Sequence, residues 1–389
     1  MIKLLLSTDA DVSLRGVDGS TPLSLAVDAG GKEVVRALVR KRGLATRDST
    51  GNNIAFRAML SGRWDITELL APRNWAETLP ADVTRACQQI WVRCADYPET
   101  LGYKDSQMFA VSSLLYEQST GLPSIEPGSL GFRWIHFPAN NPAWIEAALI
   151  NWCLEAGVDD IESALGLLSS LNHCHCGQYP HSRHHQPACK VYGKNLWVSM
   201  PYLSYDFVLD FQKLQDTIQQ VANSTVSDQQ SAELSRDELL IKAYKTPGGQ
   251  GLHFRRTLDQ FFYPNFDTRL RDRDQVVCRY QKGIGSEDPT LYMVDQMWIL
   301  ILEGRLVITS LPQRLDRTAP MEVRYNPQEY GLDVARNIMN GVFPDIHGVV
   351  LETTGRCCGI FDRHVPLNEA YLFLSMFEAS IGRVAGREA

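Results

Sequence analysis

The most apolar stretch of the chain, residues 291–315, reads LYMVDQMWILILEGRLVITSLPQRL and limits the folds that the chain can adopt. A membrane-spanning helix needs about 20 apolar residues in a row. Any such window here includes Asp295, Glu303 and Arg305. Each of these charges costs roughly 2.5–3.5 kcal/mol near the centre of a bilayer, whereas each Leu, Ile or Val returns only about 0.3–0.6 kcal/mol. The sequence therefore predicts that this stretch does not span a membrane.

The Glu303-Gly304 pair divides this stretch into two segments rich in β-branched and aromatic residues, Trp298–Leu302 and Leu306–Ser310. Two such segments joined by a short turn containing glycine predict a β-hairpin. The first segment is apolar at consecutive positions, so both of its faces should be buried. The hairpin therefore predicts a sheet covered by helices in a layered α/β domain.

Length and charge narrow the class of protein. At 389 residues the chain is long enough for two domains, or for one domain with a repeat segment attached. Its net charge of −7 argues against a nucleic-acid-binding protein. The nine cysteines do not resemble a secreted disulfide framework, and the apolar start MIKLLLSTDADV is too short for the core of a signal peptide. We therefore expect a cytoplasmic protein without nucleic-acid partners.

The first 75 residues contain an internal repeat with an offset of 32 residues, which aligns Gly19 with Gly51. This offset is close to the ankyrin period of about 33 residues. The first copy carries Thr-Pro-Leu from Thr21, at the place where ankyrin repeats start their first helix. Residues 1–75 are therefore predicted to form an all-α ankyrin segment of about two and a half copies.

Within this segment we expect two helix–turn–helix units, Thr21–Lys41 and Ile54–Leu70, stacked side by side. About three ankyrin copies are usually needed for stability, because each copy buries its apolar face against its neighbours. The units should therefore lean on residues 76–125, which are predicted to form a helical connector. Two interpretations stay open: the repeats bind a protein partner, or they are units of a longer array that no longer binds one.

Residues 126–389 are predicted to form the α/β domain. Trp134–Phe137 resembles a short strand, and Asn141 is a favourable N-cap with Pro142 at the first helical position. Residues 217–235 are rich in Gln, Ser and Asp and poor in apolar side chains, which predicts a mobile insertion.

Further elements are expected later in this domain. Ser235 and Glu238 have the spacing of a capping box at the start of a short helix. Apolar runs predict strands at Val276–Tyr280 and Val349–Leu351, and apolar residues at helical spacing predict an amphipathic helix over 368–386.

A segment rich in histidine and cysteine, HCHCGQYPHSRHHQPAC, occupies residues 173–189. Thiolates and imidazoles are the preferred ligands of zinc, so Cys174, Cys176, His184 and Cys189 are candidates for a tetrahedral site. The Cys-x-Cys spacing is tighter than zinc motifs favour, and no second paired motif follows. A polar surface loop is the alternative, and we expect no structural metal here.

Signatures of catalysis are missing from the sequence. It contains no Gly-x-Ser-x-Gly motif, no His-Glu-x-x-His motif and no full phosphate-binding loop. We therefore expect no enzymatic activity and no resident cofactor.

Seven blocks of the chain, in order, resemble the ankyrin and CorA-like magnesium transporter proteins of filamentous fungi. These blocks are RWIHFPANN, WVSMPYLSYD, LLIKAY, LHFRRTLDQFFY, RDRDQVVCRY, YMVDQMWILILEGRLVITSLP and FEASIG. The resemblance covers about residues 130–385 and places the ankyrin segment where the family has it. Within the blocks, the residues that best match the family motifs are Arg256, Thr257, Leu258, Asp259, Gln260, Asp295 and Gln296.

The resemblance implies a cytosolic α/β domain, a stalk helix over 368–386, and two further membrane helices that form a pore as a homo-oligomeric pentamer. It also implies that magnesium bound by carboxylates between protomers regulates the pore, although no single Asp or Glu here can be matched to that role. The sequence departs from the family at Ser204-Tyr205-Asp206, where relatives have His-Trp-Glu, and the 173–189 segment partly matches a basic family segment that ends in Pro-x-Cys. That match gives Cys189 a family explanation and weakens the zinc hypothesis.

Two functions therefore compete. The chain is expected to be the cytosolic, partner-binding and regulatory part of a CorA-like magnesium transporter, unable to transport without the membrane helices and their Gly-Met-Asn motif. The alternative is a free-standing ankyrin-type protein-interaction module. Sequence that follows codon 389 would distinguish the two.

Overall fold

The structure of the protein is a computed structural model. It describes residues 11–12, 14–42, 53–76, 79–98, 107–118, 130–156, 160–175, 188–223, 235–244, 252–253, 255–263, 266–283, 285–303 and 305–312. The strand expected at 349–351 and the helix expected over 368–386 lie outside these residues, as do most of the residues expected to form a half copy before Thr21.

The two predicted helix–turn–helix units are present as two antiparallel helix pairs. Their helices are α2 (Pro22–Ala29), α3 (Lys32–Arg42), α4 (Ile54–Leu60) and α5 (Trp64–Leu70). The α2 helix begins as expected, because the Thr21 hydroxyl accepts from the backbone N–H of Ser24 at 3.1 Å and Pro22 occupies the first turn. The helix α2 lies against α4, and α3 lies against α5. The prediction of two stacked helix–turn–helix units is therefore confirmed.

An ion pair joins the two units, and a glycine follows the first helix of each. Arg57 on α4 makes a bidentate pair with the Asp28 carboxylate on α2, with both contacts at 2.6 Å. Gly30 and Gly62, which are 32 residues apart, follow the first helix of each unit with φ of +71° and +66°. A side chain with a Cβ is strained in this left-handed region, so the repeat register is visible in the backbone itself.

The segment predicted to be a helical connector is only partly helical. A short 3₁₀ turn, η1 (Pro72–Asn74), precedes it. The segment itself contains α6 (Ala81–Gln89) and α7 (Val111–Leu115), with two strands between these helices. The strands β1 (Trp91–Pro98) and β2 (Gln107–Ala110) pair with each other, and β1 also pairs with the next strand along the chain. The prediction was wrong here because pairing with the later strand fixes residues 91–98 as β1, in which Val92 is buried between the more exposed Trp91 and Arg93.

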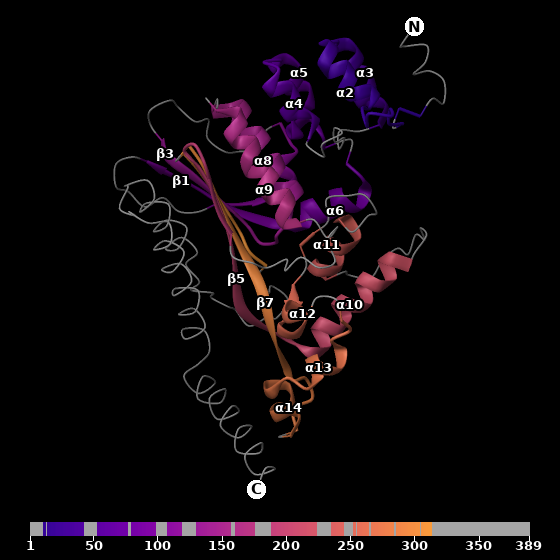
Figure 1. Ribbon diagram of the computed structural model, residues 1–389, viewed down its shortest axis with the longest axis vertical. Coiled ribbons are helices and arrows are strands. Elements are labelled where there is room, and N and C mark those ends of the chain that lie inside the picture. The colour runs from indigo at the N-terminus through magenta and orange to yellow at the C-terminus, as the bar shows by residue number, and fades with distance from the viewer. Residues whose placement is uncertain are drawn as a thin grey trace.

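Eight of the described strands form one mixed sheet (Figure 1). The strands that follow β2 are β3 (Leu130–Phe137), β4 (Ala188–Tyr192), β5 (Asn195–Phe207), β6 (Arg256–Thr257), β7 (Thr290–Leu302) and β8 (Leu306–Ser310). Their order is β2-β1-β3-β8-β7-β5-β4, and β6 pairs with β7. The β3–β8 pair is parallel, whereas the other pairings are antiparallel.

The predicted hairpin is confirmed as β7 and β8. The two strands pair antiparallel from Trp298 opposite Ser310 to Leu302 opposite Leu306. Glu303 in the turn has a φ of +50°, which a tight connection requires. The strand β7 is longer than expected, since it begins at Thr290 and pairs with β5 over almost its whole length.

Both faces of the hairpin are buried. On one face, Trp298 and Leu300 belong to a core that also contains residues of α8 (Pro142–Ala156) and α9 (Ile161–His175). On the other face, Ile299 and Ile301 are equally buried. The fold is therefore a helical repeat followed by a mixed α/β region, as the hairpin predicted.

The remaining helices confirm some expectations and correct others. They are α10 (Val208–Asn223), α11 (Arg236–Tyr244), α12 (Leu258–Phe262), α13 (Arg269–Arg273) and α14 (Val276–Gly283). The α11 helix has the expected capping box, because Ser235 N–H donates to the Glu238 carboxylate at 2.7 Å and Glu238 N–H donates back to the Ser235 hydroxyl at 3.3 Å.

Two predictions in this region are wrong. Residues 217–223 are the last two turns of α10 and not part of a mobile insertion, because α10 is long enough to pack Phe211 into the core while its later turns carry polar side chains. Residues 224–234 lie outside the described part. Val276–Tyr280 forms the start of α14 instead of a strand, since a run of three apolar residues does not distinguish a buried strand from a buried helical turn.

The ankyrin units and the α/β region share one hydrophobic core. Phe56 and Ile66 of the ankyrin helices belong to the same buried cluster as Trp144 of α8 and Trp298 of β7. The helix α4 contacts α9, and the η1 turn contacts α8. The repeats therefore lean on the α/β region through packed side chains and are not a separate folding unit.

We predict that Phe56→Ala destabilises the whole chain. Phe56 is completely buried on α4, and truncating a buried phenylalanine costs about 3–5 kcal/mol. Because the core is shared, hydrogen exchange should show that amide protection falls in α8 and α9 as well as in α2–α5. Leu25→Ala, at a position that is 55% exposed on α2, is the control and should change stability by less than about 0.5 kcal/mol. Loss of protection confined to the ankyrin helices would contradict a shared core.

A second prediction concerns the pH dependence of stability. His136 on β3 is buried beside Thr309, and this burial, with smaller contributions from Arg93 and Arg236, lowers the pKa of His136 from 6.5 to about 3. The unfolded chain therefore binds a proton that the folded chain does not, so the stabilisation is complete above pH 6.5 and is lost as the pH falls below it.

Denaturant unfolding at pH 7.5 and pH 5.5 measures this effect. The free energy of unfolding should fall by about 1.4 kcal/mol more in the wild type than in His136→Gln, because Gln has no proton to gain. Equal falls in the two proteins would show that His136 is not held neutral.

Candidate functional site

The residues that match the family motifs come together where β6 meets β7. The strand β6 places Arg256 opposite Val294 and Thr257 opposite Met293. The next four residues begin α12, and the Thr257 hydroxyl caps this helix by accepting from the N–H of Gln260 at 3.0 Å. The Gln260 side chain accepts from the N–H of Thr257 in return at 3.2 Å, which completes a capping box.

Arg255, directly before β6, forms the charged centre of this site. Its guanidinium donates to both carboxylate oxygens of Asp295 on β7 at 2.9–3.1 Å and to Asp206 on β5 at 2.7 Å. It also donates to the Tyr205 carbonyl at 3.2 Å. The three side chains are 11%, 1% and 9% exposed for Arg255, Asp295 and Asp206. Arg255 therefore links two strands of the sheet to the segment that leads into α12.

Two amide side chains extend the site along β7. The Asn140 amide donates to the Gln296 carbonyl at 2.7 Å, and its side-chain oxygen accepts from the Ser310 hydroxyl at 2.8 Å. At the other end, Gln275 accepts from the Tyr292 N–H at 2.7 Å and donates to the Asp259 carboxylate at 3.1 Å. Asn140 and Gln275, which are far apart in the sequence, thus supply hydrogen-bond partners to backbone and side-chain groups beside the buried strand β7.

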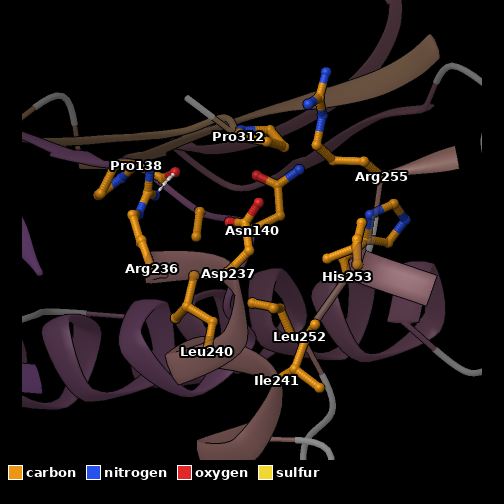
Figure 2. Close-up of a pocket in the computed structure, with 12 residues that line it drawn as sticks. Pro138, Asn140, Arg236, Asp237, Leu240, Ile241, Leu252, His253, Arg255 and Pro312 are labelled. Atoms are coloured by element: carbon orange, nitrogen blue, oxygen red, sulfur yellow. Dashed lines mark hydrogen bonds between the residues drawn. The ribbon is translucent and has the colours of Figure 1, made fainter. Parts of the chain in front are cut away.

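A small hollow lies next to Arg255 (Figure 2). Its apolar lining comes from Leu240 and Ile241 of α11 and from Leu252, while Asn140 and His253 add polar groups. Figure 2 shows the Arg236 side chain reaching the carbonyl of Pro138 at the edge of the hollow, and an interaction joins these two groups. The His253 ring lies edge-on to Trp298, with centroids 5.5 Å apart.

The electrostatics of the site favour a structural role for its charges. One guanidinium faces two carboxylates in a buried setting, so each carboxylate has a partner and the hollow carries no strong excess of positive charge. Burial lowers the pKa of the Arg256 guanidinium and raises the pKa of the Asp272 carboxyl on α13. Within the described residues, no group of three or more His, Cys, Asp or Glu side chains is placed to hold a metal ion.

The structure describes two of the four zinc candidates. Cys174 belongs to the last turn of α9, and Cys189 is exposed on the edge strand β4. Cys176 and His184 lie outside the described residues, so the proposed cluster itself is not seen.

The sequence predicted some residues of the site and not others. It singled out Asp295 and Gln296 but missed Arg255, which precedes the Arg256 that it named. It noticed Asp206 only as a departure from the family, although this carboxylate accepts from Arg255. Two neighbouring charged residues before a capping box, RRTLDQ, were the available signal, but a partner two strands away leaves no mark in the local sequence.

One comparison with known proteins gives a result, and it concerns the N-terminal helices. A family model described as Ankyrin repeat matches residues 18–52, which include α2 and α3. No curated protein and no solved structure matches the chain. The first helix–turn–helix unit is therefore an ankyrin repeat. Among the described residues, no helix is both long enough and apolar enough to cross a membrane.

We predict that Asp295→Ala lowers the free energy of unfolding by about 3 kcal/mol. Removing one member of a buried ion pair costs roughly 3–5 kcal/mol because it leaves a buried charge. The lower end applies here, since Arg255 keeps Asp206.

Urea denaturation measures the change, and Asp267→Ala is the matched control. Asp267 also pairs with an arginine, Arg269, but its side chain is 60% exposed, so its loss should lower the free energy of unfolding far less than the loss of Asp295 does. Similar losses for the two variants would contradict the role given to the buried pair.

Proposed function

We propose that the chain is a protein-interaction module whose partner binds an exposed face of the two ankyrin units. The observation that carries this proposal is the pair of exposed leucines beside the Asp28–Arg57 ion pair. Leu25 and Asp28 are three residues apart on α2, and Arg57 and Leu60 are three residues apart on α4. Residues at this spacing share a helix face, so both leucines flank the ion pair on one surface.

The exposure of these leucines supports a contact surface. Leu25 is 55% exposed and Leu60 is 47% exposed, while their neighbours Leu23 and Met59 are buried. The two helices are held by the Asp28–Arg57 pair and by the core that they share with the α/β region. A rigid surface loses little conformational entropy on binding, which favours its use as a docking site.

The test first uses the purified full chain as bait to capture a partner from a cell lysate. The captured protein is then purified, and calorimetry measures its affinity for the chain. Leu25→Ser/Leu60→Ser should weaken its binding at least about tenfold, because apolar residues at an interface centre contribute more than about 1 kcal/mol each. Val191→Ser, at a position that is 52% exposed on β4, is the control and should bind as the wild type does. Unchanged binding by the double variant would reject this face, and the absence of any specific partner would favour repeats that no longer bind one.

A second candidate function is the cytosolic part of a CorA-like magnesium transporter. The observation that favours it is that three of the resembling blocks meet at one place. Asp206 ends WVSMPYLSYD, Arg255 lies in LHFRRTLDQFFY, and Asp295 lies in YMVDQMW. Aspartate replaces the family glutamate at 206, so the departure keeps the carboxylate that Arg255 needs.

Sequence that follows codon 389 in the transcript tests this candidate directly. A stalk continuation with two apolar membrane helices and Gly-Met-Asn would support it, and a stop codon would favour the free-standing module. In the transporter, the pentamer, the cytosolic face of the membrane and regulation by magnesium would all follow from the family.

We predict that calorimetry on the isolated chain detects no saturable magnesium binding below the millimolar range. Magnesium keeps several of its waters and is held by few carboxylates. In the transporter these carboxylates belong to different protomers, so a separate chain supplies only part of each site. A tight site in the monomer would contradict this and would argue for a magnesium sensor that works alone.

A further inference from the structure

A group of large apolar side chains is exposed at the end of α12 and on α13. Phe262 is 64% exposed, Phe266 is 73% exposed and Leu270 is 81% exposed, and Tyr263 beside them is 39% exposed. Single exposed apolar residues are common on soluble proteins, but four within nine residues form a contiguous feature. In Figure 1, α13 lies at the end of the molecule opposite to the ankyrin helices.

Contacts within this segment join the end of α12 to α13. The guanidinium carbon of Arg271 lies 4.2 Å from the centroid of the Tyr263 ring, which joins α13 to the end of α12. The Phe266 N–H donates to the Tyr263 carbonyl at 3.2 Å. We call Phe262, Tyr263, Phe266, Arg269, Leu270 and Arg271 the aromatic–arginine patch.

The surroundings of the patch are basic although the chain is acidic. Between residues 262 and 283, five basic and two acidic side chains are exposed, and a third acidic residue, Asp272, is buried, so the segment has a net charge of +2 in a chain of net charge −7. The exposed basic side chains are Arg269, Arg271, Arg273, Arg279 and Lys282, and the exposed acidic ones are Asp267 and Asp274. The positive charge is thus concentrated beside the exposed rings.

We propose that the aromatic–arginine patch docks the protein on an anionic lipid surface. Aromatic and leucine side chains insert at the boundary between headgroups and acyl chains, and arginines beside them attract anionic lipids. Phe262, Phe266 and Leu270 supply the inserting groups. The charge comes from the exposed arginines Arg269, Arg271 and Arg273, of which Arg269 also pairs with Asp267 and Arg271 with Asp259. This is a peripheral contact of an exposed surface, and it is independent of any membrane-spanning segment.

Two other occupants fit the patch less well. In a symmetric dimer the same patch would face itself, which would bring two surfaces of net positive charge together. A nucleic acid would neutralise the arginines, but Leu270, the most exposed of the apolar residues, offers no ring for a base to stack on.

The test is flotation of the full chain with vesicles of phosphatidylcholine, with and without about 30% phosphatidylserine as the anionic lipid. The wild type should float with the anionic vesicles, remain free with the neutral ones, and be released at about 0.5 M salt, where the Debye length is only a few ångströms. Phe262→Ser/Phe266→Ser/Leu270→Ser should lower the partition coefficient at least about tenfold. Arg269→Gln/Arg273→Gln should weaken binding and reduce its salt dependence.

Leu25→Ser/Leu60→Ser is the matched control, since it removes exposed apolar residues at the other end of the molecule, and it should float as the wild type does. Circular dichroism and thermal unfolding check that the variants are folded, which their exposure predicts. The proposal is overturned if the wild type does not float with anionic vesicles, or if the triple variant floats with them as well as the wild type does. It is also overturned if the triple variant instead dissolves a dimer seen by light scattering, or instead abolishes binding to a single-stranded RNA oligonucleotide.

Discussion

Burial of both faces of β7 is the constraint around which the rest of the protein is arranged. This strand pairs with β5, β6 and β8, and its side chains are buried at Trp298 and Leu300 on one face and at Ile299 and Ile301 on the other. A strand in this position cannot lie at an edge or on an open surface, because it would expose apolar side chains to water. One face of β7 packs against a core that includes residues of α8 and α9. The hairpin turn follows its last residue, and Asp295 on this strand accepts from Arg255.

The shared core gives the ankyrin units their stability and limits their freedom. The two described repeat units are fewer than ankyrin repeats usually need to be stable alone. Here α4 and η1 rest on α9 and α8, so the α/β region replaces the missing neighbours. The exposed face at Leu25 and Leu60 is consequently presented in a fixed orientation to the rest of the molecule. The aromatic–arginine patch at the opposite end would let the protein hold a partner and a lipid surface at the same time.

Local patterns in the sequence predicted the elements whose cause is local. The Thr21-Pro22 start of α2, the Ser235–Glu238 capping box and the Glu303-Gly304 turn each depend on residues only a few positions apart. Predictions failed where the cause was distant. Val276–Tyr280 looked like a strand because its apolar residues are consecutive, and residues 91–98 were taken as helical although they form β1 against β3. In both cases the partner that decides the structure is far away in the chain.

The candidate site also has features with a local cause and features with a distant cause. The sequence by itself determined the repeat register, the hairpin, the helix caps and the net charge, since each follows from residue types at short spacing. Only the tertiary structure decided that Arg255 reaches both Asp206 and Asp295, because these residues are separated by 49 and 40 positions. It also decided that Phe262, Phe266 and Leu270 stay exposed while Trp298 is buried, although all four are large and apolar. Side-chain chemistry sets what a residue gains from burial, but the packing of distant elements decides which residues are buried.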